Sequence, residues 1–302
     1  MLHGTSLMVL PPYKGAVFRG AFGNAFRRMV CAAPKADCAT CLLRRQCLYV
    51  AFFEPPPPAN YPDAAKFSQA TPPYVLNPPL TNREAFHPGD LLDFEMVLIG
   101  PAIEALPYFI YTFTELGTMG LGSRRGKYDL VKVDLLRGEQ ALRIYDGSTQ
   151  TLTSYPPAER IGPYPEDSRA NTVTLRFLTP LRLKVKGDLA TQLTFPLFFD
   201  RLAQRLTLLA SFYNSSIAPP DFSPLLALAQ YIAVTVNELH WYDWERYSAR
   251  QKDTMKFGGL KGRMALSGEL GAFMPYVRVG QQVNVGQSTT FGLGRYIIES
   301  VG

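Results

Sequence analysis

Two stretches of this chain share a Gly-Leu-Gly step followed by a basic residue, a tyrosine and an apolar run. The first, GTMGLGSRRGKYDLVKV, spans residues 117–133, and the second, VGQSTTFGLGRY, spans residues 285–296. Glycine loses more backbone entropy on folding than any other residue, so a cluster of glycines marks a place where only a bare backbone fits. The spacing differs between the two copies, yet the repetition raises the hypothesis that the protein consists of two similar halves.

The length of the chain and the distribution of its prolines indicate two domains. With 302 residues, the chain is long enough to build two separate hydrophobic cores. The proline-rich segment 154–168 shows no apolar periodicity, which is typical of a linker. We therefore expect an N-terminal domain over residues 1–153 and a C-terminal domain over residues 169–302.

Apolar residues at helical spacing predict helices in both domains. The segment 15–30 is the clearest case, with an apolar stripe formed by Phe18, Phe22, Phe26 and Met29. Further helices are expected over residues 106–117 with Gly117 as C-terminal cap, over residues 195–213, and from an N-terminal cap at Ser223.

Period-two patterns predict strands between these helices. In residues 171–178, the side chains of Val173, Leu175 and Phe177 face one way and the polar residues the other. Residues 141–152 are typical of a hairpin around Asp146-Gly147. Strands are also expected within residues 90–100, 128–136, 238–251, 262–270 and 295–301. The order is roughly βαββαβ in each half, which favours the α+β class with two tandem ferredoxin-like (RRM-like) domains.

The composition, with 47% hydrophobic and 19% charged residues, is that of a soluble globular protein. A formal net charge of +6 modestly favours a polyanionic partner such as nucleic acid. The first residues lack the basic and apolar regions of a signal peptide, and no window of about eighteen residues is uncharged and apolar. We expect a cytoplasmic protein without a membrane span.

All four cysteines lie within residues 31–47, at Cys31, Cys38, Cys41 and Cys47. Four thiolates in one loop can surround a tetrahedral metal ion, and the C-x2-C pair is the usual bite of such a site. Disulfides, which a reducing cytoplasm disfavours, and four unrelated thiols are the alternatives. We expect a structural zinc rather than an iron–sulfur cluster, although thiolates permit either metal group.

The first glycine stretch resembles a nucleotide-binding P-loop only superficially. Three residues, not four, separate Gly122 from Gly126-Lys127, and Tyr128 stands where a serine or threonine belongs. A turn-rich structural loop with charged neighbours is the plainer alternative. Basic residues beside accessible backbone N–H groups suit the phosphates of RNA, and Gly286, Gly292 and Gly294 would let the chain approach them. The basic candidates for RNA contact are Arg124, Arg125, Lys127, Lys256, Lys261, Arg263 and Arg295.

The chain has three histidines, and only one lies in a patterned segment. His3 is near the terminus and His87 precedes a turn, whereas His240 lies among aromatic and basic residues. A histidine beside tryptophan is often a partly buried hydrogen-bonding residue, but imidazole also suits proton transfer near neutral pH. No Ser-His-Asp signature or HExxH motif is present, so metal-assisted hydrolysis and hydride transfer lack support.

Several stretches taken together resemble one family. LPPYKGAVFRGAFGNAFRRMVC, CLYVAFFE and ELGTMGLGSRRGKYDL are similar to its first half, and VTLRFLTPLRLKV, WYDWERYSARQ, GGLKG and VGQSTTFGLGRY to its second. The family is that of the CRISPR-associated pre-crRNA processing endoribonucleases (the Cas six family) of the RAMP superfamily, in the branch with an N-terminal cysteine cluster. The resemblance covers nearly the whole chain.

This resemblance implies an endoribonuclease that binds CRISPR repeat RNA and cleaves precursor crRNA without a catalytic metal. A ribose 2′-hydroxyl would attack the adjacent phosphate and leave a 2′,3′-cyclic phosphate. Such a reaction needs a base, a proton donor and cations near the developing charge. We assign these roles to His240, Lys14 and Arg250, and we add Arg19 and Arg27 of the first helix to the RNA-binding candidates.

One departure from the family keeps an alternative open. Many members carry a histidine on the first helix, but residues 15–30 contain none, and Asn24 takes a central position. The chain would then be a non-cleaving RAMP subunit that holds crRNA, with other CRISPR effector subunits as partners. A third hypothesis, a cysteine-metal sensor or redox protein, treats the basic glycine stretches as incidental.

Overall fold

The computed structural model describes residues 1–58, 69–159, 169–214, 219–243, 245–248, 253–256 and 258–302. The chain divides into two units, Met1–Glu159 and Arg160–Gly302, each with its own hydrophobic core. The division falls within the proline-rich segment that the sequence analysis takes as a linker. In the described ranges, no helix has both the length and the apolar character needed to span a bilayer.

The C-terminal unit has a βαββαβ order, which the sequence analysis expects roughly for each half, although α7, its second helix, is not among the predicted helices. Its main elements are β11 (Thr172–Leu181), α5 (Phe195–Tyr213), β14 (Ala233–Asn237), β18 (Gly259–Ser267), α7 (Met274–Val283) and β19 (Tyr296–Val301). The antiparallel sheet has the order β14-β18-β11-β19, so the first and third strands of the motif lie in the middle. This arrangement is ferredoxin-like, and the α+β fold class of two tandem ferredoxin-like domains is confirmed.

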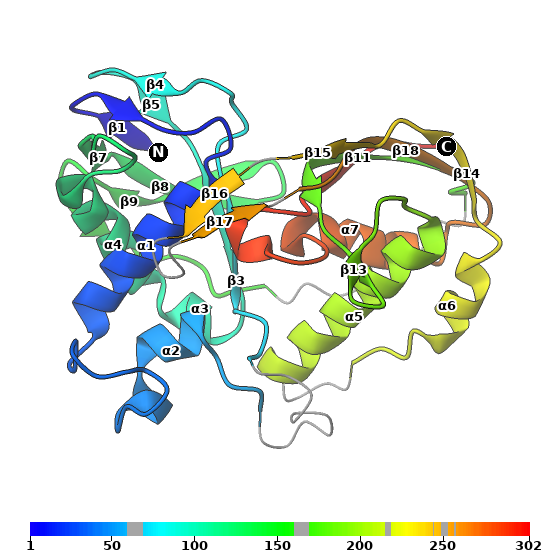
Figure 1. Ribbon diagram of the computed structural model, residues 1–302, viewed down its shortest axis with the longest axis horizontal. Helices are drawn as coiled ribbons and strands as arrows, with labels where there is room; N and C mark the ends of the chain where they lie inside the picture. The colour runs from blue at the N-terminus through cyan, green and yellow to red at the C-terminus, as the bar shows by residue number, and fades with distance from the viewer. Residues whose placement is uncertain (59–68, 160–168, 215–218, 244, 249–252, 257) are drawn as a thin grey trace. The chain divides into compact units, whose positions relative to one another are not determined.

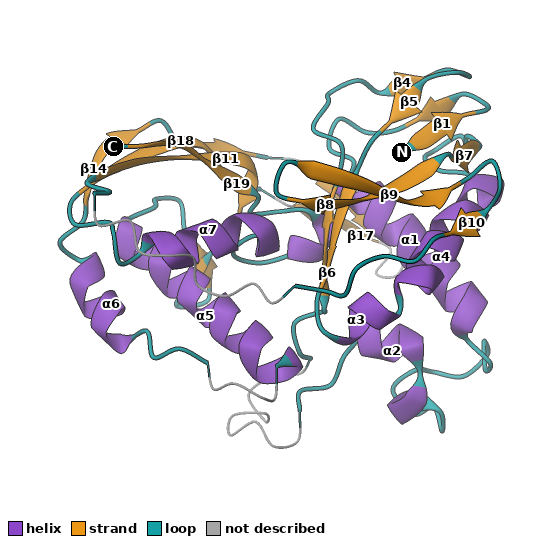
Figure 2. Cartoon of the chain, turned by 180° about the vertical axis from the view of Figure 1, so that it is seen from behind, coloured by secondary structure: helices purple, strands orange, loops and turns teal. Residues whose placement is uncertain are grey.

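Helices cover one face of this sheet, as Figures 1 and 2 show from opposite sides. The alternation in β11 explains why: Val173, Leu175 and Phe177 are buried, whereas Thr172 and Arg176 are exposed. The shorter elements of the unit are β12 (Lys184–Val185), β13 (Asp188–Leu189), α6 (Ser223–Ala229), β15 (His240–Tyr242), β16 (Glu245–Ser248), β17 (Asp253–Lys256) and η3 (Thr289–Phe291).

The N-terminal unit is built around an aromatic core between α1 (Gly15–Val30) and α4 (Leu106–Met119). The rings of Phe22 and Phe113 stack with their centroids 4.9 Å apart. Its sheets are small and antiparallel, with the orders β5-β1-β7 and β10-β9-β8 and the pairs β2-β4 and β3-β6. The remaining elements are β1 (Leu2–Gly4), β2 (Met8–Val9), η1 (Arg44–Gln46), α2 (Leu48–Phe53), β3 (Tyr74–Asn77), β4 (Ala85–Phe86), β5 (Leu91–Leu92), β6 (Glu95–Leu98), α3 (Pro101–Glu104), β7 (Tyr128–Leu130), β8 (Lys132–Arg137), β9 (Gln140–Asp146) and β10 (Thr151–Leu152).

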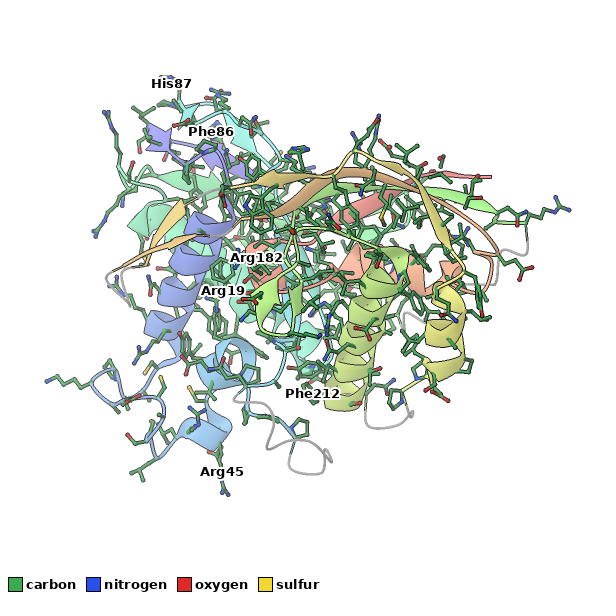
Figure 3. The ribbon with its side chains drawn as sticks, turned by 45° about the vertical axis from the view of Figure 1, so that its right-hand side comes forward. Arg19, Arg45, Phe86, His87, Arg182 and Phe212 are labelled. Carbon is green, nitrogen blue, oxygen red and sulfur yellow. The ribbon has the colours of Figure 1, made fainter. Side chains whose placement is uncertain are left out.

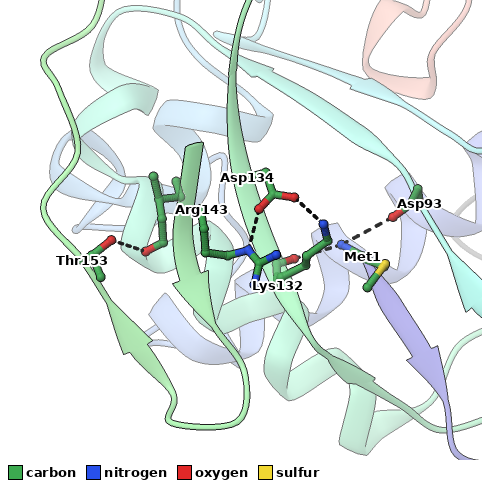
Figure 4. Close-up of polar contacts among 7 residues, drawn as sticks. Met1, Asp93, Lys132, Asp134, Arg143 and Thr153 are labelled. Atoms are coloured by element: carbon green, nitrogen blue, oxygen red, sulfur yellow. Dashed lines mark hydrogen bonds and ion pairs between the residues drawn. The ribbon is translucent and has the colours of Figure 1, made fainter. Parts of the chain in front are cut away.

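The hairpin expected around Asp146-Gly147 is present as β9 and β10, and an ion pair links β9 to its other neighbour, β8 (Figure 4). Asp134 of β8 accepts hydrogen bonds from Lys132 Nζ at 2.7 Å and Arg143 Nε at 2.6 Å. Burial alone would raise the pKa of Asp134, but the hydrogen bonds from the two cations outweigh it and lower the pKa. The β8–β9 ribbon is therefore tied by charge as well as by its backbone ladder.

Three details of the helices differ from the expectations. Gly117 does not end its helix, since α4 continues to Met119 and Gly120 is the C-terminal cap. Ser223 is the first residue of α6 rather than its cap, and Asp221 accepts a hydrogen bond from its N–H. Helix α7 was not predicted from the sequence. Helix ends depend on tertiary contacts, which local propensity does not contain.

The close contact between Gly117 and Tyr128 can be tested by comparison with Gly20, a helical glycine with open space around it. A Cβ at Gly117 would lie 2.2 Å from the Tyr128 carbonyl oxygen, whereas a Cβ at Gly20 of α1 would meet nothing within 4 Å. We predict that Gly117→Ala lowers the free energy of unfolding of the N-terminal unit by about 1–3 kcal/mol or more through overpacking. The matched Gly20→Ala should raise it by roughly 0.5–1 kcal/mol. Urea unfolding of both variants measures this, and equal effects would show that Gly117 is not held by Tyr128.

Candidate functional site

The C-terminal glycine loop, residues 284–294, follows α7 and is hydrogen-bonded to the end of β11. Gly294 donates its backbone N–H to the Pro180 carbonyl at 3.0 Å, and Gln287 donates to the Arg182 carbonyl at 2.9 Å. Within the loop, Val285 donates to the Gly294 carbonyl at 3.1 Å. These hydrogen bonds attach the loop to the rest of the C-terminal unit.

The glycines of this loop are required by that close approach. A Cβ at Gly294 would lie 1.7 Å from the Val285 carbonyl oxygen, and one at Gly286 would lie 2.5 Å from the Arg182 carbonyl oxygen. Both glycines, and Gly292, have the positive φ that side chains disfavour. Gly292 and Gly294 are buried. At Gly294, the chain's own backbone fills the space that a side chain would take, and contact of these glycines with RNA stays a prediction.

A buried threonine that the sequence analysis did not single out holds the loop to the sheet. Thr179 of β11 is 1% exposed, and its Oγ1 donates to the Gly292 carbonyl at 2.7 Å. The same oxygen accepts the Arg295 backbone N–H at 2.9 Å. A polar residue in the buried register of Val173, Leu175 and Phe177 is the sequence signal that could have revealed it.

The first glycine loop is also shaped by its own unit, but it presents cations. A Cβ at Gly122 would lie 2.2 Å from the Val9 carbonyl oxygen. The side chains of Arg124, Arg125 and Lys127 are exposed on this loop, and Lys127 Nζ donates to the Thr118 carbonyl. The structure therefore brings these three predicted RNA-binding residues together on one exposed turn.

The predicted cations of the C-terminal unit lie in different surroundings. Arg263 Nε lies 2.8 Å from Glu299 Oε2, and Arg176 Nε lies 2.9 Å from Oε1 of the same carboxylate. Hydrogen bonding to Glu299 raises the pKa of the Arg263 guanidinium. One carboxylate is thus shared by two guanidinium groups, and Glu238 adds a second negative charge near Arg263. Arg295 is half-buried beside the loop.

His240 lies on β15, at the edge of the same sheet. It is exposed and pairs with Lys261 of β18, whose Nζ lies 5.1 Å from the Tyr242 ring centroid. An imidazole and an ammonium group therefore lie on paired residues of neighbouring strands. Arg250 and the side chain of Lys256 lie outside the described part of the chain.

Lys14 is a structural residue rather than the catalytic one that the sequence analysis expects. It precedes α1 and is fully buried. Its Nζ donates to the carbonyl oxygens of Pro11 at 3.2 Å, Pro12 at 3.1 Å and Thr81 at 2.5 Å. An ammonium group has three donors, so none is left for a phosphate. Burial lowers the pKa of Lys14.

Arg19 and Arg27 contact aromatic rings of their own unit. Arg19, which is labelled in Figure 3, lies on α1. Its guanidinium carbon lies 4.4 Å from the Phe53 ring centroid, and that of Arg27 lies 5.7 Å from the Tyr49 ring centroid. Arg27 also donates to the Ala36 carbonyl at 3.4 Å. These contacts hold both arginines against aromatic rings of their own unit, and their contact with RNA stays a prediction.

The cysteine loop connects α1 to α2, and its four thiols are half-buried and free of disulfides. Cys31 is the C-terminal cap of α1, and Cys47 is the N-terminal cap of α2, so both ends of the loop are anchored. Among the described residues, which include all four cysteines, no three His, Cys, Asp or Glu side chains are arranged to hold a metal ion. The donor types suit zinc, but the thiols as placed do not form a ligand cluster.

Comparisons with known proteins match both units. Residues 2–157 match a family model described as an N-terminal domain, and residues 175–296 match the model of the CRISPR-associated endoribonuclease Cas6. An uncharacterized protein of Archaeoglobus fulgidus is 27% identical over 296 residues, which cover 96% of this chain and 93% of that protein.

Two solved structures share the fold. A product complex of a Thermus thermophilus Cas6 has a TM-score of 0.56 at 17% identity and covers 98% of this chain and 97% of its own. A partial complex named Cas6-RT-Cas1–Cas2 has a TM-score of 0.54 at 16% identity and covers 99% of this chain and 44% of its own. At these identities, the likeness concerns the fold.

The surroundings of Lys14 generate a stability prediction. Lys14→Met would leave the carbonyls of Pro11, Pro12 and Thr81 without their donor, so we predict a loss of about 2–4 kcal/mol in the free energy of unfolding of the N-terminal unit. Lys35→Met, at an exposed position, should change it by less than about 0.5 kcal/mol. Chemical denaturation of both variants measures the difference, and a stable Lys14→Met protein would return Lys14 to the functional candidates.

Proposed function

Because this chain belongs to the CRISPR-associated endoribonuclease Cas6 family, we propose that it binds CRISPR repeat RNA and cleaves precursor crRNA within it. The observation that carries the proposal is the match of residues 175–296 to the model of that family. This segment contains both the C-terminal glycine loop and the sheet edge where the exposed His240 pairs with Lys261. The exposed Arg124, Arg125 and Lys127 supply further cations for a phosphate backbone.

The proposed reaction is metal-independent attack of a ribose 2′-hydroxyl on the adjacent phosphate. The 2′-oxygen forms a bond to phosphorus, and the bond to the 5′-oxygen breaks as that oxygen takes a proton from solvent water. The products are a 2′,3′-cyclic phosphate and a 5′-hydroxyl. His240 is the proposed base for the 2′-hydroxyl proton, because its imidazole is exposed on an ordered strand. Lys261 on the paired strand would stabilise the negative charge that develops on the phosphate. The role of Arg250 stays a prediction.

A second candidate function is a crRNA-binding subunit that does not cut, with other CRISPR proteins as partners. Two observations favour it. Helix α1 carries an exposed Asn24 and no histidine, and Lys14 at its start is buried. Both candidates share RNA binding, so cleavage separates them.

Cleavage of a repeat transcript in EDTA tests the enzyme directly. We predict a 2′,3′-cyclic phosphate product, and we predict that His240→Ala lowers single-turnover cleavage by about a hundred- to ten-thousand-fold, the usual range for general-base catalysis. RNA affinity should barely change, because a neutral imidazole adds little to phosphate binding.

His87→Ala is the matched control, since His87 is an exposed histidine of the N-terminal unit beside a turn. Its cleavage rate should equal that of the unchanged protein. If the unchanged protein binds the transcript tightly without cutting it, the non-cleaving subunit is the correct function. A loss smaller than about tenfold in His240→Ala would remove His240 as the base.

For the cysteine loop, we propose a structural zinc. The support is the C-x6-C-x2-C-x5-C spacing on a loop whose two ends are anchored by α1 and α2. Binding would draw the four thiols together and release protons, because thiolates are the ligands.

We predict about one equivalent of zinc per chain in elemental analysis of chelator-free protein, reduced strongly in Cys41→Ser. Thr40→Ser, on the same loop, should keep the metal. Protein that contains no metal and is equally stable with or without added zinc would contradict the proposal.

A further inference from the structure

Three buried polar side chains form hydrogen bonds within the C-terminal glycine loop or beside it. Thr179 bonds the Gly292 carbonyl and the Arg295 N–H, as described above. Arg205 of α5 donates Nε to the Val283 carbonyl at 2.8 Å, and Asn284 donates Nδ2 to the Leu293 carbonyl at 3.3 Å. Their exposed fractions are 1% for Thr179, 7% for Arg205 and 0% for Asn284. Burying polar side chains is unfavourable unless they make hydrogen bonds, so this set holds a defined loop shape.

The backbone of the loop needs such support. Besides its glycines, the loop has two residues with side chains in the left-handed region, Asn284 with φ 56° and Ser288 with φ 62°. Side-chain-bearing residues adopt this region only when their surroundings impose it. Without bonds to the rest of the unit, the loop would have other conformations of similar energy.

Thr179 is the contact that connects the loop to its basic residue. Its hydroxyl acts as donor to Gly292 and as acceptor from Arg295, so one atom sets the position of both. The Arg295 carbonyl accepts the Leu178 N–H at 2.9 Å, which fixes the backbone of Arg295 from its other side. The Thr179 hydroxyl therefore helps to fix the backbone position of Arg295, from which its side chain extends.

We propose that Thr179 is a positioning residue for RNA binding, which acts by holding the glycine loop and Arg295 in the shape that contacts an RNA phosphate. This inference rests on the proposed function. Thr179 is buried and does not touch RNA itself. Its contribution passes through the main chain of Gly292 and Arg295.

Three variants of the full chain separate the hydroxyl from its packing. Thr179→Val keeps the volume and removes the hydroxyl, whereas Thr179→Ser keeps the hydroxyl and removes the methyl group. Thr235→Val is the matched control, because the Thr235 hydroxyl donates to the Ala265 carbonyl at 3.3 Å on the same sheet but away from the loop. Each is measured for affinity to a repeat RNA over a series of salt concentrations, with thermal unfolding recorded alongside.

We expect Thr179→Val to weaken RNA binding by about tenfold and to lower the slope of log affinity against log salt by about one, as for one lost phosphate contact. Thr179→Ser and Thr235→Val should bind like the unchanged protein. Reduced thermal stability alone would not change the salt slope. If Thr179→Val does not fold, Thr179→Cys replaces it, because a thiol forms only weak hydrogen bonds. This variant should also lower the slope of log affinity against log salt, but by less than one.

The outcomes distinguish this proposal from the function on which it rests. An unchanged protein that does not bind repeat RNA overturns both. Binding by the unchanged protein together with an unaltered affinity and salt slope in the folded Thr179→Val or Thr179→Cys overturns the role of Thr179 alone. A loss in Thr179→Ser equal to that in Thr179→Val would assign the effect to packing and would likewise overturn it.

Discussion

The antiparallel pairing of β11 with β18 on one side and with β19 on the other is the constraint on which the C-terminal unit depends. Through it, residues near position 175 meet residues near 264 and near 298, so segments far apart in the sequence form one surface. The buried register of β11 faces α5 and α7. The same strand continues to Thr179 and Pro180, where it receives the glycine loop. A single strand therefore supports the core, the charged face and the loop.

The placement of charge in this protein differs from what residue counting suggests. The chain has a net charge of +6, but several of its cations serve the fold. Lys14 binds three backbone carbonyls, Arg19 lies over Phe53, and Arg263 shares Glu299 with Arg176. A buried or paired cation contributes less to an external phosphate than an exposed one, because its donors are already in use. The first glycine loop and the exposed sheet edge carry more of the available charge.

Strong local patterns in the sequence predicted much of the fold. The apolar stripe of residues 15–30 became α1 with the same bounds, and the alternation in residues 171–178 became part of β11. The Asp146-Gly147 turn joined the expected strands. Helix α7 escaped prediction because Gly280 and the valines within residues 274–283 are weak helix formers. Lys14 was misassigned because a buried lysine and an exposed one look alike in a sequence.

By itself, the sequence determined the strongest helices and strands, the resemblance to an RNA-processing family and the presence of two glycine stretches. These follow from periodicity, composition and motif, which are local properties of the chain. Only the tertiary structure decided what lies against the glycines. Whether a bare backbone meets RNA or the protein's own carbonyls depends on residues distant in sequence, such as Val9 beside Gly122 and Thr179 beside Gly292. Close packing gives each such space to a single occupant, and beside Gly122 and Gly294 that occupant is the chain's own backbone.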